Sequence, residues 1–213
     1  MKIVVISPES DEPREHAVMA VLFAAGLERY HVRKPQWPRE RLAAWLDAVP
    51  ARWRSRLVLH QHHELAPQSG VGGIHWRDGS FRGEGSGIAA RPDAGGHPPR
   101  PSYTSCSCHD FGTLRGAFGH YDAAFFSPVF ASISKPGYRP AVSHAELSAA
   151  LRAKTDARRR TAIIALGGVT PENAALCLEL GFDGVAVLGA LWQASDPLEV
   201  FNRLQQPLAV HAT

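Results

Sequence analysis

The sequence predicts an α/β fold, a single (β/α)8 (TIM) barrel domain that spans residues 1–213. Short apolar runs alternate with helical patterns along the whole chain, which is typical of βα units and a parallel sheet. Eight such runs are present, and eight strands close a barrel. The last two runs end in glycines, and the loops after the seventh and eighth strands of such barrels commonly bind phosphate.

Each strand is expected where apolar residues run between turn signals, and each helix where they recur at helical spacing. The expected strands are 2–7, 29–33, 57–60, 73–76, 102–107, 123–127, 161–166 and 184–188. The expected helices are 14–25, 38–48, 111–117, 144–153, 171–180 and 197–205, with Thr170 as the cap of the fifth and Gly181 as its end. Residues 64–68 suit one further turn. Residues 77–101 are rich in Gly, Pro and Asp and lack helical periodicity, which predicts an irregular or missing fourth helix.

Charge, hydropathy and cysteine content argue against a nucleic-acid-binding or membrane protein. The net charge of +3 is spread along the chain, and its densest basic patch, ARRR at 157–160, is typical of a solvated loop, so no nucleic-acid partner is expected. No apolar run has the length of a membrane span, and residues 1–6 predict a strand and not a signal peptide, so no membrane partner is expected. The three cysteines, Cys106, Cys108 and Cys177, indicate buried, reduced thiols and a cytoplasmic protein. A homodimer is compatible with these features.

A repeated pattern near the C-terminus predicts the ligand class. Residues 163–190 read as strand, Gly167-Gly168, helix, strand and a second glycine turn at Gly189. Backbone N–H groups at Gly167, Gly168, Leu188 and Gly189 can approach a phosphate closely, because glycines present no side chain. A Gly-Gly pair alone often only makes a turn. Its repetition at two successive strand ends favours phosphate binding.

Seven segments at or near the predicted strand ends follow one another in order: YHVRK at 30–34, LHQHHELA at 59–66, GIHW at 73–76, SCHD at 107–110, SPVFASISK at 127–135, GG at 167–168 and VLG at 187–189. They resemble the segments QLREK, NDRxDxA, GVHL, SxHS, GPVFxTxTK and the glycine turns of the thiamin-phosphate synthase and thiazole tautomerase family. The resemblance covers nearly the whole chain. It implies a (β/α)8 barrel of thiamin biosynthesis whose partners are small phosphorylated thiazole or pyrimidine ligands.

Two departures from the family motifs bear on the reaction. In the synthases, as the resemblance implies, an Asp of the NDR segment and a second Asp shortly after GVHL hold a magnesium–pyrophosphate complex. Here His60-Gln61 replaces the first pair, and the second position falls near Asp78 or Ser80, with Asp78 two residues early. A carboxamide lacks the charge that Mg²⁺ prefers in its ligands. Lys34 also stands where the family has Glu.

The resemblance therefore implies three alternatives. The first is a metal-independent thiazole-phosphate tautomerase, an isomerase that needs no cofactor. The second is a divergent thiamin-phosphate synthase, a transferase that couples hydroxymethylpyrimidine pyrophosphate to thiazole phosphate, with Mg²⁺ as its cofactor and Asp78 as a metal ligand. The third is a non-catalytic barrel that binds a thiazole or thiamin phosphate.

His109 is the expected catalytic residue, since it matches the proton-transfer histidine of the SxHS segment. A histidine, with a reference pKa of about 6.5, can accept and return a proton at neutral pH. Strand alternation places Ser105, Ser107 and His109 on one face, and the cysteines between them on the other. The alternative is a structural histidine beside a helix cap at Asp110.

Further polar residues are expected around the ligand. Arg33, Ser107, Ser132, Ser134 and Lys135 suit a phosphate or carboxylate, although a salt bridge or an ordinary polar loop is the alternative for some of them.

Four other residues are expected at the mouth of the barrel, namely His31, His60, Gln61 and His75. His60, His62 and His75 have the chemistry of a zinc or nickel site. Hydrogen-bonded histidines are the commoner arrangement, and no metal is expected there.

Overall fold

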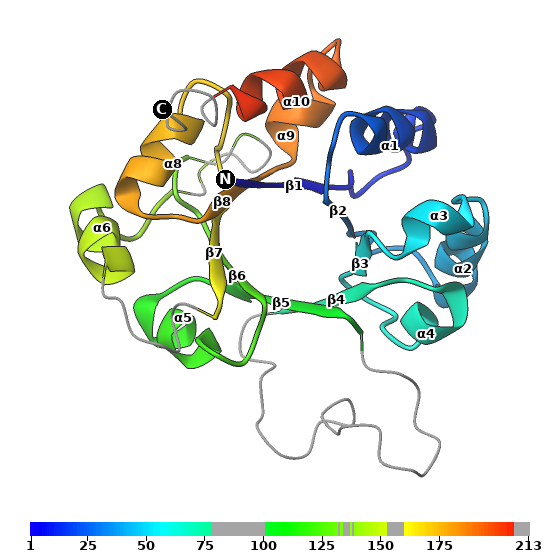
Figure 1. Cartoon of the computed structure of the whole chain (residues 1–213), viewed down its shortest axis with the longest axis horizontal. Helices are drawn as coiled ribbons and strands as arrows, with labels where there is room; N and C mark the ends of the chain where they lie inside the picture. The colour runs from blue at the N-terminus through cyan, green and yellow to red at the C-terminus, as the bar shows by residue number, and fades with distance from the viewer. Residues whose placement is uncertain (78–100, 132, 134–136, 138, 153–159, 207–213) are drawn as a thin grey trace.

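Eight parallel strands close into a barrel in a computed structural model that describes residues 1–77, 101–131, 133, 137, 139–152 and 160–206 (Figure 1). Each strand pairs with the next, and β8 pairs with β1. The predicted fold class is confirmed. The strands are β1 Lys2–Ile6, β2 Arg29–Val32, β3 Leu57–Leu59, β4 Gly73–Trp76, β5 Tyr103–Cys108, β6 Ala123–Phe126, β7 Ala162–Ala165 and β8 Gly184–Val187.

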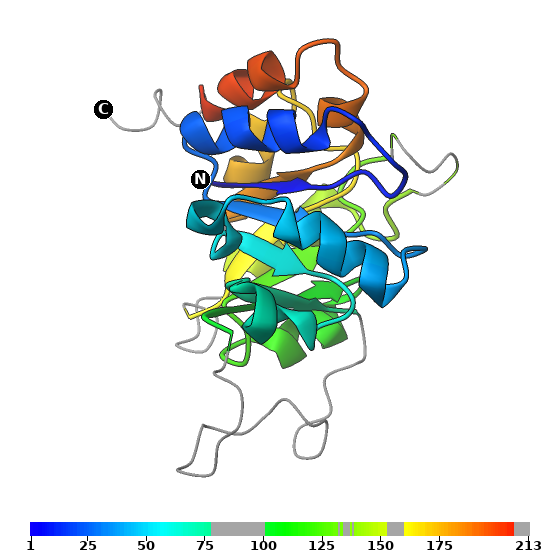
Figure 2. The same cartoon turned by 90° about the vertical axis from the view of Figure 1, so that its right-hand side faces the viewer.

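The helices lie outside the ring of strands (Figures 1 and 2). They are α1 Glu15–Ala24, α2 Arg39–Asp47, α3 Ala51–Arg54, α4 Leu65–Ser69, α5 Phe111–Ala117, α6 His144–Arg152, α8 Ala174–Leu180, α9 Gly189–Trp192 and α10 Pro197–Gln205. The expected turn at 64–68 is realised as α4, whereas the short helices α3 and α9 were not expected. Residues 78–100 lie outside the described residues, so an irregular or missing fourth helix stays a prediction. No helix in the described part of the chain has the length and apolarity needed to cross a membrane.

The core has two layers because side chains alternate between the two faces of each strand. In β1, Val4 and Ile6 point into the barrel, where they pack with Phe125 and Ala186, while the alternate residues of β1 pack against the helices. A strand that is buried on both faces is apolar throughout, which explains the unbroken run in β1.

The start of α8 differs from the prediction. The helix begins at Ala174, and Thr170 is not its cap. Asn173 instead accepts a hydrogen bond from the Thr170 N–H at 2.9 Å and donates one to the Gly168 carbonyl at 2.9 Å. These bonds hold residues 170–173 in a turn, which delays the helix. Its end at Gly181, with φ of +104°, is as predicted.

Lys34 takes part in a buried polar network between β2 and α1. Its ammonium donates to the Glu15 carboxylate at 2.6 Å and to the Ser10 carbonyl at 3.0 Å, and both charged side chains are almost fully buried. The Tyr30 hydroxyl donates to the other Glu15 oxygen at 2.8 Å. Lys34, which stands where the family has Glu, therefore pairs with the Glu15 carboxylate on α1. Its side chain points away from the barrel interior.

We expect Lys34→Met to lower the free energy of unfolding by about 3–5 kcal/mol, because it leaves the Glu15 carboxylate buried without its cation. Chemical denaturation measures this loss. The control is the double variant Glu15→Leu/Lys34→Met, which removes both charges and should recover most of the stability. A single variant as stable as the natural chain would contradict the role of this ion pair.

Candidate active site

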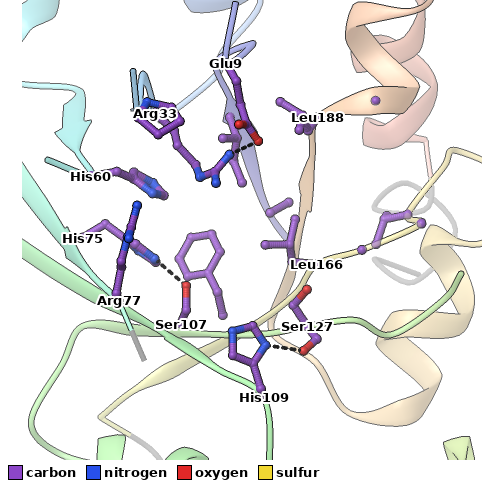
Figure 3. A pocket seen from close by; sticks show the side chains of 18 of the residues that line it. Glu9, Arg33, His60, His75, Arg77, Ser107, His109, Ser127, Leu166 and Leu188 are labelled. Carbon is purple, nitrogen blue, oxygen red and sulfur yellow. Dashed lines mark hydrogen bonds and ion pairs between the residues drawn. The ribbon is translucent and has the colours of Figure 1, made fainter. Parts of the chain in front are cut away.

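A cavity of about 620 Å³ opens at the carboxyl ends of the strands. Every strand, or the loop directly after it, contributes to its lining (Figure 3). The lining includes these residues expected from the sequence: Arg33, His60, Gln61, His75, Ser107, His109, Gly167, Gly168, Leu188 and Gly189. Ser132, Ser134, Lys135 and Asp78 lie outside the described residues, so their roles stay predictions.

His109 follows β5 directly and faces the cavity. Its Nδ1 lies 2.7 Å from the Ser127 carbonyl oxygen. A carbonyl only accepts hydrogen bonds, so Nδ1 carries the hydrogen and Nε2 carries the lone pair of the neutral ring. The next residue, Asp110, caps α5 by accepting from the Thr113 N–H at 2.9 Å. The helix cap and the cavity-facing histidine are therefore neighbouring residues with separate roles.

Three histidines meet on the other side of the cavity. His60 and His75 line it with stacked rings whose centroids are 4.0 Å apart (Figure 3). His31 was expected at the mouth, but it is fully buried and does not line the cavity. It lies two residues before Arg33 on the inward face of β2, one layer deeper in the barrel. His31 Nδ1 is 3.0 Å from His60 Nε2.

Burial keeps these three histidines neutral. Loss of hydration lowers the pKa of His31 and His60 well below the ordinary value, and lowers that of His75 to about 3. His75 also contacts two hydroxyls, Ser105 Oγ at 2.8 Å from Nδ1 and Ser107 Oγ at 2.8 Å from Nε2.

His62 does not join this cluster, so the group of His60, His62 and His75 that was the less favoured alternative does not form. The strand β3 ends at Leu59, and the alternation of side chains on which that group depended does not extend to His62. The backbone of His62 adopts a φ of +53°, and its Nε2 lies 3.1 Å from the Trp37 carbonyl. His31 occupies the third position in place of His62.

The charged groups of the cavity were only partly expected. Arg33 forms an ion pair with Glu9, which the sequence interpretation missed because Glu9 lies in the irregular loop after β1. Arg77 also lines the cavity and was not expected. Glu9 is the one carboxylate among the described lining residues. Gln61 Nε2 is buried and has no hydrogen-bond partner in the part of the chain that the structure describes.

The Gly167-Gly168 turn packs closely on the segment after β6. Both residues have a positive φ, +92° and +66°. A Cβ on Gly168 would lie 2.3 Å from the Ala131 carbonyl oxygen, and one on Gly167 would lie 2.8 Å from Pro128 Cβ. The Phe130 N–H donates to the Gly167 carbonyl at 3.0 Å. The two glycines are thus required by packing, besides lining the cavity.

The sequence is similar to those of known thiamine-phosphate synthases. The sequence model of the family described as thiamine monophosphate synthase matches residues 102–191, from the start of β5 into α9. The thiamine-phosphate synthase of Laribacter hongkongensis is 28% identical over 193 residues, which cover 88% of this chain and 84% of that protein. That of Chromobacterium violaceum is 29% identical over 198 residues, covering 90% and 88%.

Solved structures extend the likeness to the whole barrel. A thiamine phosphate pyrophosphorylase from Bacteroides thetaiotaomicron covers 100% of both chains with a TM-score of 0.74 and 25% identity. The chain is thus similar in sequence and in fold to thiamine-phosphate synthases. A thiamine phosphate pyrophosphorylase from Pyrococcus furiosus, at 16% identity and a TM-score of 0.72, shares the fold over 100% of this chain and 97% of its own.

His109 and both glycine turns of this synthase-like chain lie within the matched residues 102–191, whereas the histidine cluster of β2, β3 and β4 lies before them. The sequence analysis expected His31 at the mouth but did not group it with His60 and His75. The inward position of His31 on β2 and the short length of β3 are the signals that would have placed it in this cluster.

We expect Gly168→Ala to destabilise the protein by about 1–3 kcal/mol more than Gly70→Ala, because an added Cβ at position 168 overpacks against Ala131. Gly70 is the matched control, since its φ of +70° gives the same backbone strain while no atom lies within 4 Å of the added Cβ. Urea denaturation of both variants measures the difference. Equal losses would mean that the close approach of the two loops does not constrain Gly168.

Proposed function

We propose that the protein is a thiazole-phosphate tautomerase that moves a proton with His109 and does not require magnesium. The observation that carries the proposal is the hydrogen bond from His109 Nδ1 to the Ser127 carbonyl at 2.7 Å. It selects the tautomer in which Nε2 accepts a proton, and it orients the ring at the wall of the cavity. A general base of this kind needs a fixed tautomer and a position within reach of the substrate.

The phosphate of the substrate would rest at the ends of β7 and β8, which are paired neighbours in the barrel. Gly167 and Gly168 bring backbone close to the cavity, and α9 begins at Gly189 directly after Leu188. Glycine presents no side chain, so backbone N–H groups at these turns can approach a phosphate closely. Ser132, Ser134 and Lys135, which lie outside the described residues, are proposed as further contacts to the phosphate.

In the proposed reaction, His109 transfers the proton while Arg33 lies at the wall of the same cavity. His109 Nε2 takes a proton from one carbon of the carboxylated thiazole and becomes an imidazolium. The substrate carries the resulting negative charge, and Arg33 contributes positive charge at the cavity wall. The imidazolium returns the proton to another carbon, which restores the neutral ring and completes the isomerisation. The Gln61 amide is a buried donor available to the substrate carboxylate.

The described cavity does not fit a magnesium–pyrophosphate complex. Magnesium takes hard oxygen ligands, usually carboxylates with phosphate and water. Glu9 is the one described carboxylate of the lining, and Arg33 already pairs with it. Gln61, in the position of the family's Asp, supplies no charge. No reaction step is therefore assigned to magnesium.

A divergent thiamin-phosphate synthase is the second candidate. The names of the relatives favour it, since those of Laribacter hongkongensis and Chromobacterium violaceum are thiamine-phosphate synthases. This candidate requires that Asp78, which lies outside the described residues, binds Mg²⁺. Glu9 is the one other carboxylate that the described lining offers.

We expect His109→Asn to lower tautomerase turnover by roughly 10²-fold or more, a typical scale for the loss of a general acid–base. Binding of the thiazole phosphate should change little, because its phosphate contacts lie on β7 and β8. A turnover assay with calorimetric binding measures both. Turnover at the natural rate would show that His109 is structural. Tight binding without turnover in either protein would favour the non-catalytic barrel.

We expect Mg²⁺ to change the affinity for inorganic pyrophosphate by less than about tenfold, because the described wall offers no free carboxylate pair. Calorimetry with and without Mg²⁺ measures this, and Asp78→Asn is the control variant. A strong Mg²⁺ requirement that Asp78→Asn abolishes would support the synthase instead.

A further inference from the structure

Three histidines from three successive strands converge inside the barrel, at the base of the cavity. One ring nitrogen from each of His31, His60 and His75 lies within 4.8 Å of the others. We propose that these histidines bind one divalent transition-metal ion of the zinc type, with a fourth coordination position open to the cavity. The inference does not rest on the proposed tautomerase activity, because metal binding is measured without turnover.

The distances suit a shared ion. Two nitrogen ligands of a tetrahedral zinc, each about 2.0–2.1 Å from the metal, are about 3.3–3.4 Å apart. His31 Nδ1 and His60 Nε2 are 3.0 Å apart, so an ion can replace the hydrogen between them with a small outward shift. The third nitrogen, from His75, lies within 4.8 Å of the other two, so bringing it into the same shell requires a movement on the order of 1 Å.

The cluster is incomplete without a further partner. His31 is fully buried, and its Nε2 has no hydrogen-bond partner among the described residues. Its Nδ1 is shared with a second imidazole. With the hydrogen of His31 on Nε2 and that of His60 on Nδ1, both facing nitrogens carry lone pairs that can bind one ion.

A neighbouring residue fixes the orientation of His75. Ser105 Oγ lies 2.8 Å from His75 Nδ1 and is itself fully buried. A ligating histidine commonly donates its other ring N–H to such a group, which selects the tautomer and directs the remaining nitrogen to the metal. With Nδ1 held by Ser105, Nε2 is the nitrogen that would bind the ion, and the ion would displace its 2.8 Å contact with the Ser107 hydroxyl.

The donor set determines the class of ion. The cluster contains only imidazoles, which suit zinc, copper, nickel and cobalt, whereas magnesium takes oxygen ligands. Burial lowers the pKa of all three histidines, so they are in the neutral form that binds metal. Three protein ligands with an open fourth position are typical of zinc sites that bind water or an anion. An anionic group in the cavity would offset the charges of the ion and of Arg33.

The test is metal binding by the full, untagged chain after its metal has been removed with a chelator. Co²⁺ is added while its visible d–d absorption is followed, and Zn²⁺ binding is measured by calorimetry. We expect saturation at one ion per chain. His60→Asn should weaken the affinity by roughly 100-fold or more, and Ser105→Ala, which touches no metal, by roughly 10–100-fold.

His62→Asn is the matched control. It removes a neighbouring histidine whose side chain contacts the Trp37 carbonyl, and asparagine tolerates the positive φ at this position. We expect His62→Asn to bind Co²⁺ as the natural chain does. Thermal denaturation of each apo variant checks the fold. At one Zn²⁺ concentration, the melting temperature should rise more for the natural chain and for His62→Asn than for His60→Asn or Ser105→Ala.

Three results would overturn the proposal. The first is the absence of saturable Co²⁺ binding. The second is an unchanged affinity in both His60→Asn and Ser105→Ala. The third is a thiolate charge-transfer band that disappears in Cys106→Ser, since Cys106 and Cys108 lie 3.9 Å apart and would then be the ligands. If His60→Asn fails to fold, Ser105→Ala decides, because it leaves all three ligands in place.

Discussion

Closure of eight short parallel strands leaves space inside the barrel for only every second side chain of each strand. This constraint divides the interior of the protein into an apolar part and a polar part. Val4, Ala123, Ile164 and Ala186 fill one part without polar atoms. On β2, β4 and β5 the same inward faces carry histidine and serine. His75 hydrogen-bonds to Ser105 and Ser107, and His31 to His60, which follows β3. The chemistry of the cavity follows from which strands carry polar residues at these positions.

The cavity combines cationic side chains with neutral imidazoles. Arg33 and Arg77 line it together with a single described carboxylate, so its charge favours an anionic ligand. The histidines add no charge, because burial opposes their protonation. A wall of this kind can hold a phosphate or carboxylate while a basic nitrogen remains available nearby, which suits proton transfer and metal binding alike.

The sequence predicted the barrel, the order of its strands and the end of α8, because these depend on local apolar patterns and on Gly181. It did not predict contacts made by irregular backbone. Gly168 was expected on grounds of phosphate binding, but its contact with Ala131 depends on how two loops meet. Grouping His62 with His60 required that β3 continue past Leu59, where the strand ends. His31 lies deeper than the mouth, and the sequence does not show the stagger of the strands that sets this depth. Glu9 lies in a loop whose conformation no periodicity describes.

The adjacency of His109 and Asp110 links helix dynamics to the site. Asp110 holds the first turn of α5 through the Thr113 N–H, and His109 is the residue directly before it. Local opening of that turn, an event that amide hydrogen exchange detects, would release the backbone that positions the imidazole. The stability of this helix cap therefore contributes to how firmly the backbone next to the His109 ring is held, beside the hydrogen bond of the ring to the Ser127 carbonyl. Residues on the outer surface of α5 would act on the His109 backbone only by changing how often this turn opens.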